Sequence, residues 1–357
     1  MRNLILFLFV CVTSLAVAEL ALRVALPQPG FSAFPKSVPA DLLQVHSGRS
    51  YSYRPGFSAD IEESFRTVNV SINSLGMRDT EVSADERIDF LAIGDSFTAG
   101  AMVEQQEAWP AQLQQQLNAD GRQLRVLNAG VSGYNMEQVR IAGEDLVALK
   151  PGAIIVGAYP AVSSRLWDPF VWLNGYPVRQ SKVKRLRVTD SGFLLATNNR
   201  WLSNKAQFWL FENLHFGGWL WSLIAPSVET PEPPKPSAEE LTVWFLDELS
   251  KLYAATSAAD IPLIVFVLAH QRQDGTFSDA LAGYNRSVVD YCVANGIPVF
   301  DSFGVLAGYP VEGVEFRAGG GSDFHWSPLG HAISAKGLAD YIVARGLIPD
   351  ASELDPQ

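Results

Sequence analysis

Cysteine is scarce in this chain of 357 residues, which contains only two. Cys11 lies in an apolar N-terminal segment and Cys292 in a predicted helix, so we expect no structural disulfide between them. The sequence also has no Cys-x-x-Cys pair and no cluster of histidine with cysteine. It therefore predicts neither a metal centre nor a cofactor.

Basic residues are also few relative to acidic residues. The chain has 27 lysines and arginines against 38 aspartates and glutamates, which gives a formal net charge of −11. A protein that binds nucleic acid normally presents a basic face to the phosphates. The charge balance therefore argues against a nucleic-acid partner.

Charge is nearly absent from the N-terminus, where an apolar run from Leu4 to Ala18 follows Arg2. The small residues at 16–18 fit the cleavage site of a secretory signal. Alternatively, residues 1–26 form an uncleaved single-pass membrane anchor, the interpretation that we favour. Val10 before Cys11 excludes a lipoprotein signal. Either way we expect the rest of the chain outside the cytoplasm, anchored at the periplasmic face of the inner membrane or secreted to the periplasm.

Short apolar runs rich in branched residues alternate with helical patterns along most of the chain. Five of these runs are typical of buried parallel strands, at residues 88–94, 124–130, 153–159, 261–269 and 297–301. Such alternation predicts an α/β fold with a parallel sheet covered on both faces. Four segments follow from this: an N-terminal segment (1–26), an arm (27–85), a sheet domain (86–160 plus 260–348) and an insertion after the third strand (161–259).

The insertion has its own composition. It contains seven of the nine tryptophans, a predicted hairpin at 183–196 and a proline-rich linker. Residues 179–187 carry five basic side chains, which on alternating strand positions would form a cationic stripe; a solvated hairpin face is the simpler interpretation. Because the insertion follows the carboxyl end of a strand, we expect it to cover the substrate cleft and to influence substrate choice.

The stretch FLAIGDSFTAG (90–100) runs from an apolar strand into a turn bounded by Gly94 and Gly100. Ser96 lies in this turn, at the carboxyl end of a parallel strand, where ligands bind in such sheets. Backbone N–H groups and the start of a helix can stabilise an oxyanion there. We interpret Ser96 as a candidate nucleophile; the alternative is a helix-capping serine without chemistry.

A serine nucleophile needs a base within hydrogen-bonding reach and an acid that orients the base. Two of the five histidines, His325 and His331, lie in SDFHWSPLGH (322–331), directly before the last predicted helix. Asp323 is the acidic residue of the same stretch. Combined with the serine turn and with Gly130 and Gly133 after the second strand, this arrangement favours His325 as the base.

These three stretches together resemble the SGNH (GDSL-type) hydrolase superfamily. Its first block, Gly-Asp-Ser-x-Thr-x-Gly, matches residues 94–100, its second matches 128–133, and its histidine block matches 325–331. The upstream sequences YSYRPG (51–56) and INSLGMRD (72–79), with the apolar N-terminus, resemble the membrane-anchored bacterial branch of this superfamily. The resemblance covers about residues 45–160 and 260–345 and leaves out the insertion.

The resemblance implies a three-layer α/β/α sandwich with five parallel strands in flavodoxin-like order. It also implies that Ser96 is the nucleophile and His325 the general base, and that the backbone N–H groups of Ser96 and Gly133 are oxyanion donors. The superfamily places its acid three residues before the histidine, where this chain has Ser322. We therefore assign Asp323, in an Asp-x-His-Trp arrangement similar to that of alginate-type O-acetyltransferases, as the acid that holds the imidazole tautomer.

A second departure follows the third strand. The superfamily carries an asparagine there as a third oxyanion donor, whereas a gapless comparison puts Ala161 at this position. Losing such a donor typically costs about 10²–10³ in rate. Ser163, Ser164 and Asn174 are candidates to replace it.

The sequence thus predicts an extracytoplasmic serine esterase that cleaves small, acetyl-like esters, with surface or exported carbohydrate as the favoured substrate. An O-acetyltransferase that passes the acyl group to a sugar hydroxyl would use the same residues. A carbohydrate-binding protein with a catalytically weakened site is the alternative from a different class. The membrane is expected as a partner through the N-terminal segment, and the oligomeric state stays open.

Overall fold

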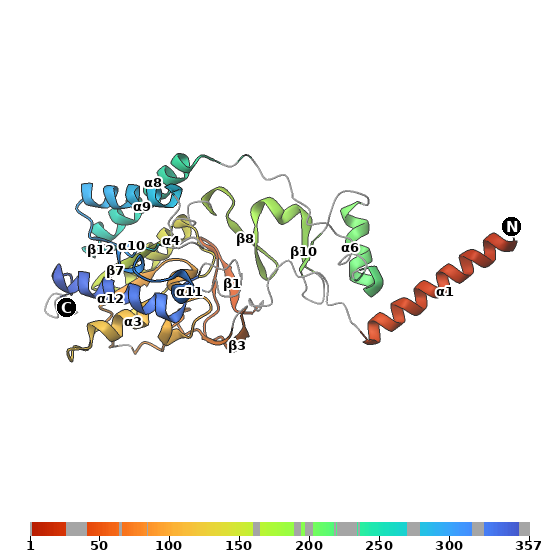
Figure 1. Ribbon diagram of the computed structural model, residues 1–357, viewed down its shortest axis with the longest axis horizontal. Helices are drawn as coiled ribbons and strands as arrows, with labels where there is room; N and C mark the ends of the chain where they lie inside the picture. The colour runs from red at the N-terminus through yellow and green to blue at the C-terminus, as the bar shows by residue number, and fades with distance from the viewer. Residues whose placement is uncertain are drawn as a thin grey trace. The chain divides into compact units, whose positions relative to one another are not determined.

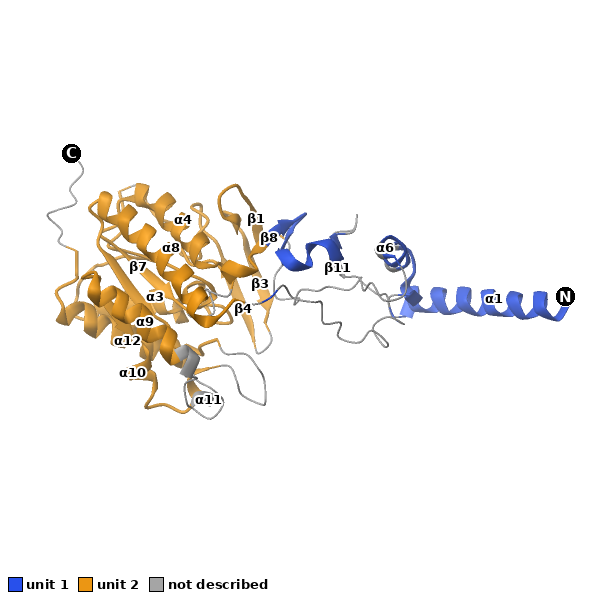
Figure 2. Ribbon diagram, turned by 90° about the horizontal axis from the view of Figure 1, so that it is seen from above, with its two compact units in different colours: residues 1–40, 171–234 blue, residues 41–170, 235–357 orange. Residues whose placement is uncertain are grey.

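The computed structural model describes residues 2–25, 41–63, 66–83, 85–159, 165–188, 194–196, 203–217, 219, 234, 236–269, 279–315 and 325–349. Two compact units divide the chain, coloured separately in Figure 2. One combines residues 1–40 with 171–234, and the other combines 41–170 with 235–357.

The larger unit is built on a five-stranded parallel sheet (Figure 1). Its strands are β5 (Phe90–Ile93), β6 (Val126–Asn128), β7 (Ala153–Ala158), β12 (Leu263–Val267) and β13 (Val299–Asp301). Their spatial order is β13-β12-β7-β5-β6. β5 and β6 are the first two strands of this sheet along the chain, and β6 lies at the edge, outside β5. This is the flavodoxin-like order. The predicted fold class is confirmed, with each strand inside its predicted run.

Helices cover both faces because each crossover between parallel strands is right-handed and the chain reverses direction after β6. On one face α3 (Trp109–Leu117) packs against α12 (Pro328–Ala344). On the other, α4 (Met136–Leu146) packs against α8 (Ala238–Ala258), which contacts α9 (Asp279–Ala294). The sequence analysis assigned α8 to the insertion, yet α8 packs within the sheet unit.

Large apolar side chains lock these layers together. The rings of Trp109 from α3 and Trp326 before α12 lie 5.1 and 6.1 Å from the ring of Phe266 in β12. On the opposite face, Gly143 of α4 lets the Leu252 side chain of α8 approach its backbone. All the residues of β5, β6, β7 and β12 are buried, so the sheet forms the core.

Short elements complete this unit. Two antiparallel hairpins form the N-terminal arm, β1 (Leu43–His46) with β2 (Ser50–Tyr53) and β3 (Ser58–Glu62) with β4 (Thr67–Ser71). Its short helical turns include α2 (Ser96–Ala99), η1 (Gln105–Glu107), η2 (Val147–Leu149), α10 (Phe303–Leu306) and α11 (Val311–Val314).

The smaller unit contains α1 (Arg2–Ala25), η3 (Gln180–Arg185), the strand pair β10 (Leu186–Val188) and β11 (Leu194–Ala196), and α6 (Asn204–Asn213). The hairpin β8 (Phe170–Leu173) and β9 (Tyr176–Arg179) begins at the boundary between the units. The pairing of β10 with β11 confirms the predicted hairpin, whose turn lies outside the described residues.

The basic residues at 179–187 do not form a stripe on alternating strand positions, which was the less favoured of the two interpretations. Lys182, Lys184 and Arg185 lie in the 3₁₀ helix η3, and only Arg187 of the remaining basic residues lies within β10. The chain needs a turn between β9 and β10, and this basic stretch supplies it. A 3₁₀ turn distributes its side chains around an axis instead of along one strand face.

Candidate active site

Ser96 begins α2 directly beyond the carboxyl end of β5, and its side chain is buried. The tight passage from strand to helix depends on glycine. A Cβ atom on Gly94 or on Gly157 of β7 would overlap the Thr98 side chain, and one on Gly130 would overlap the backbone at Thr98 and Ala99. Glycines at the ends of three adjacent strands thus allow α2 to sit close over the sheet.

The Oγ atom of Ser96 lies 2.8 Å from the Nε2 atom of His325, although 229 residues separate them in sequence. Trp326 fixes the segment beside His325, because its buried indole donates to the carbonyl of Ala269 at 3.0 Å. The ring of Phe97 lies 5.1 Å from the imidazole. The structure therefore brings together the predicted hydroxyl and the predicted base.

Ser96 and Gly133, the two predicted oxyanion donors, have backbone amides without a hydrogen-bond acceptor among the described residues. Gly133 has φ +88°, and a Cβ atom there would lie 2.5 Å from the hydroxyl of Tyr51. The loop after β6 therefore requires glycine at this position, and both amides are available to bind an anionic oxygen.

Asp95, the residue before Ser96, is completely buried. Its carboxylate accepts a hydrogen bond from the amide of Phe97 at 3.1 Å and caps α2. It also accepts one from the guanidinium of Arg165 at 3.2 Å. Burial raises the pKa of Asp95, while the charge of Arg165 and the amide of Phe97 act in the opposite direction.

Several predicted residues cannot be compared in this way. Asp323, Ala161, Ser163 and Ser164 lie outside the described residues, so the acid and the first part of the segment after β7 stay predictions. Asn174 is described: it has φ +41° in the turn between β8 and β9. Its position is that of an Asn-Gly hairpin turn.

Arg165 was not predicted as a site residue from the sequence, although it directly follows Ser164 in the segment after the third strand. Its Nη1 atom donates to Asp95 and, at 3.1 Å, to the carbonyl oxygen of Tyr134. It thereby joins the residue before Ser96 to the residue after Gly133. The only signal in the sequence that could have identified Arg165 is that it is the first basic residue after the third strand.

The N-terminal arm also reaches the site. The hydroxyl of Tyr53 accepts from the amide of Ser132 at 3.2 Å and contacts its Oγ atom at 3.1 Å, and the hydroxyl of Tyr51 donates to the Ser132 carbonyl at 3.0 Å. These contacts hold the loop that contains Gly133. The sequence YSYRPG thus has a positional role beyond the family resemblance.

The Arg78-Asp79 pair of the arm acts on the neighbouring strands. Arg78 is buried and donates to the carbonyls of Ala99, Gly100 and Val103, so it holds the end of α2. Asp79 accepts from the amide of Asn128 at 2.8 Å, at the end of β6. Through these contacts with backbone atoms, both residues help to position the serine turn and the neighbouring loop.

His331, the second histidine of the C-terminal stretch, is buried in α12 and has a different environment. Its Nδ1 atom accepts a hydrogen bond from the amide of Trp109 at 3.1 Å. Burial lowers the pKa of His331 to about 3, with smaller contributions from His325 and Arg78. This imidazole is therefore a neutral packing group.

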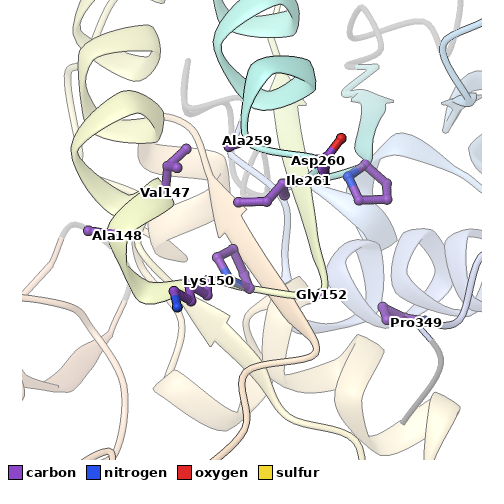
Figure 3. A pocket seen from close by; sticks show the side chains of 10 residues that line it. Val147, Ala148, Lys150, Gly152, Ala259, Asp260, Ile261 and Pro349 are labelled. Atoms are coloured by element: carbon purple, nitrogen blue, oxygen red, sulfur yellow. The ribbon is translucent and has the colours of Figure 1, made fainter. Parts of the chain in front are cut away.

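A surface hollow lies elsewhere on the sheet unit. It has a volume of about 590 Å³ and lies at the amino ends of β7 and β12, beside Lys150, Gly152 and Pro262 (Figure 3). Because the strands are parallel, this is the opposite end of the sheet from Ser96. In the described part of the chain, no three residues among His, Cys, Asp and Glu gather into a possible metal site.

Comparisons with known proteins agree with this geometry. Residues 92–158 match the model of the GDSL-like Lipase/Acylhydrolase family, a range that includes Ser96 and Gly133. No curated protein matches the chain.

Three similar solved structures illustrate the range of likeness. A lipolytic protein of the G-D-S-L family from Desulfitobacterium hafniense has 16% identity, with 71% of this chain and 98% of that chain covered and a TM-score of 0.40. The lipase/acylhydrolase from Enterococcus faecalis has 12% identity, 73% and 97% coverage and a TM-score of 0.42. The psychrotrophic esterase EstA from a Pseudoalteromonas species has 11% identity, 72% and 99% coverage and a TM-score of 0.39. The matched part of the sheet unit, which contains the serine turn, is therefore similar to the GDSL-like Lipase/Acylhydrolase family, and the similarity supports ester hydrolysis as the class of activity.

Proposed function

We propose that this protein is a serine esterase in which Ser96 is the nucleophile, His325 the general base and Asp323 the acid that orients the imidazole. The observation that carries the proposal is the 2.8 Å contact between Ser96 Oγ and His325 Nε2. A hydroxyl is a weak nucleophile until a base takes its proton, and this distance is within the range for direct proton transfer.

In the proposed reaction, Ser96 Oγ attacks the ester carbonyl while its proton passes to His325 Nε2. The N–H groups of Ser96 and Gly133 stabilise the tetrahedral oxyanion. His325 then gives the proton to the leaving alcohol, which leaves an acyl-enzyme. Water, deprotonated by the same nitrogen, attacks the acyl group and releases the acid and free Ser96.

The substrate class that we propose is a small acyl ester on exported or surface carbohydrate. Its support is the Asp-x-His-Trp arrangement at 323–326 and the tryptophan-rich insertion. The same residues would serve an O-acetyltransferase, in which a sugar hydroxyl replaces water in the second step. The two reactions differ only in the acceptor.

A fluorophosphonate probe tests the nucleophile. It modifies an activated serine covalently, so the wild-type protein should be labelled and Ser96→Ala should not. Ser287→Ala, which removes a serine of α9 that bonds only to the backbone carbonyl of Gly283, is a matched control and should label like the wild type. A folded wild-type sample that takes up no label would reject the esterase and favour a carbohydrate-binding protein on the same fold.

Product analysis separates hydrolysis from transfer. The protein is incubated with an activated acetyl ester, with and without a glycan acceptor, and both free acetate and acetylated glycan are measured. The esterase proposal expects acetate as the main product under both conditions. Acetyl appearing mainly on the glycan would identify an acetyltransferase instead.

We further propose that α1 anchors the protein in the membrane, with the catalytic unit outside the cytoplasm. The helix has 24 residues with a mean hydropathy of 2.5 in its most apolar window, and none of that window is buried. At 1.5 Å per residue it is about 36 Å long, enough to cross a bilayer.

The end of α1 is held by its own unit. The carboxylate of Glu19 accepts from the amides of His215 and Phe216 at 2.9 and 2.7 Å, and Arg23 donates to the carbonyl of Asn213 at 2.8 Å. Trp209 in the adjoining α6 is 58% exposed, and tryptophan is favoured at membrane–water interfaces. These contacts place an aromatic segment beside the end of the apolar helix.

Mass spectrometry of the protein isolated from its host tests the anchor. We expect an intact N-terminal segment and a protein that stays with membranes in alkaline carbonate. A soluble form that begins at Glu19 would show that the segment is a cleaved signal. Protease added to intact spheroplasts should degrade the catalytic unit; protection of that unit would contradict the extracytoplasmic location.

A further inference from the structure

The segment after β7 has Ala161 where the SGNH pattern places an asparagine, and Arg165 is the first residue described after 160–164. Its side chain is largely buried and lies within the sheet unit. The segment follows β7, while Ser96 follows the adjacent strand β5. Arg165 therefore comes from the neighbouring strand end at the switch point of the sheet, where sites in this type of fold are built.

The contacts of Arg165 are specific. Nη1 donates to Asp95 Oδ2 at 3.2 Å and to the carbonyl oxygen of Tyr134 at 3.1 Å. Its backbone is fixed as well, because Asn135 Nδ2 donates to the Arg165 carbonyl at 3.3 Å. Asp95 and Tyr134 are the chain neighbours of Ser96 and Gly133, whose amides are the proposed oxyanion donors.

Charge gives Arg165 a second effect. A buried carboxylate next to the nucleophile repels the negative charge that develops on the substrate oxygen, and a paired guanidinium offsets that repulsion. The charged and titratable groups that face Asp95 are Arg165, His325 and Tyr284. Of these, Arg165 is the permanent cation.

We propose that Arg165 is a positioning residue that holds the serine turn against the loop after β6, so that the amides of Ser96 and Gly133 converge on one oxyanion. In the same role it compensates the charge of Asp95. This inference rests on the proposed esterase function. It assigns a role to a residue that the family pattern does not contain.

The test compares Arg165→Gln, Arg165→Lys and Arg165→Ala with the wild type on a small activated ester. We expect kcat to fall by about tenfold to a hundredfold in Arg165→Gln with KM nearly unchanged, since preorganised donors act mainly on the transition state. Lysine lacks the planar guanidinium group but keeps the positive charge that compensates Asp95. Arg165→Lys should therefore retain more kcat than Arg165→Gln. Arg140→Gln is a matched control, because Arg140 is similarly buried and also paired, with Glu144 and Glu248 on α4 and α8.

Two readouts distinguish positioning from a general loss of stability. Added guanidinium ion should restore part of the kcat of Arg165→Ala and leave Arg140→Gln unchanged. In a double-mutant cycle, Asp95→Asn should reduce the effect of Arg165→Gln, because both act on the same charge pair.

The outcomes separate this inference from the proposed function. If the wild type takes up no fluorophosphonate, the esterase itself fails and Arg165 has no such role. If the wild type is labelled and a folded Arg165→Gln reacts as fast, only the Arg165 proposal is overturned. A kcat loss without rescue by guanidinium, in step with a lower melting temperature, would also overturn it.

Discussion

The Nδ1 atom of His331 accepts a hydrogen bond from the backbone amide of Trp109, and both residues are buried between α3 and α12. Only a neutral imidazole can accept this hydrogen bond. Burial lowers the pKa of His331 to about 3. This pairing fixes the helix that follows His325 and has consequences for stability.

Acid should destabilise the fold through His331. Because its folded pKa lies below the unfolded value near 6.5, the unfolded state binds more protons once the pH falls below about 6.5. His331 therefore contributes a loss of up to about 1.4 kcal/mol in unfolding free energy per pH unit below that value, continuing toward pH 3. Urea unfolding at pH 7 and pH 5 measures it. His331→Asn keeps an acceptor but cannot titrate, so it should flatten this slope; equal slopes in both proteins would show that His331 is not responsible.

Gly133 should not tolerate a side chain. Alanine there would adopt an unfavourable φ of +88° and would overlap the Tyr51 hydroxyl. We expect Gly133→Ala to lose about 1–3 kcal/mol of stability and at least about tenfold in kcat, because the amide moves. Enzyme assays and thermal melts measure both quantities. Gly121→Ala is the control, since φ at Gly121 is +92° in open space, so stability but not activity should fall.

Arg78 should be irreplaceable by lysine. Its guanidinium serves several backbone carbonyls at the end of α2, and burial lowers its pKa. One ammonium cannot reach all these acceptors, and each buried carbonyl left unpaired costs about 1–3 kcal/mol. We expect Arg78→Lys to lose about 2–4 kcal/mol in chemical unfolding. Arg122→Lys, in an exposed pair with Asp120, should change stability little; similar losses in both variants would contradict this role.

Tyr53 should influence catalysis without touching the substrate. Tyr53→Phe removes the hydroxyl that contacts both the amide and the Oγ of Ser132. Stability should fall by about 1 kcal/mol per lost hydrogen bond, and kcat should fall as the loop bearing Gly133 loosens. Steady-state kinetics on a small ester checks the effect. Ser52→Ala in the same hairpin is the control, and a Tyr53→Phe enzyme with wild-type kcat would reject the coupling between arm and site.

The positions of the strands and the two central residues could be predicted from local signals in the sequence, whereas the order of the strands was implied by the resemblance to the SGNH superfamily. Continuous apolar runs predicted β5, β6, β7, β12 and β13, since a parallel strand buried on both faces must be apolar throughout. Ser96 and His325 were found from short blocks that lie directly beside strand and helix ends. The predicted hairpin began at residue 183, whereas η3 continues to Arg185, because lysine and arginine carry no strong preference between a 3₁₀ turn and an exposed strand.

The amino-acid sequence by itself determined the parallel sandwich, the serine turn and the separate apolar N-terminus, because strand burial, glycine turns and helix patterns are properties of neighbouring residues. Only the tertiary structure decided that His331 is a neutral packing group held by the amide of Trp109, and that Arg165 joins Asp95 to Tyr134. Both outcomes depend on which side chains of distant segments share a buried space. There, a charge or an imidazole is stabilised by partners that no local pattern specifies.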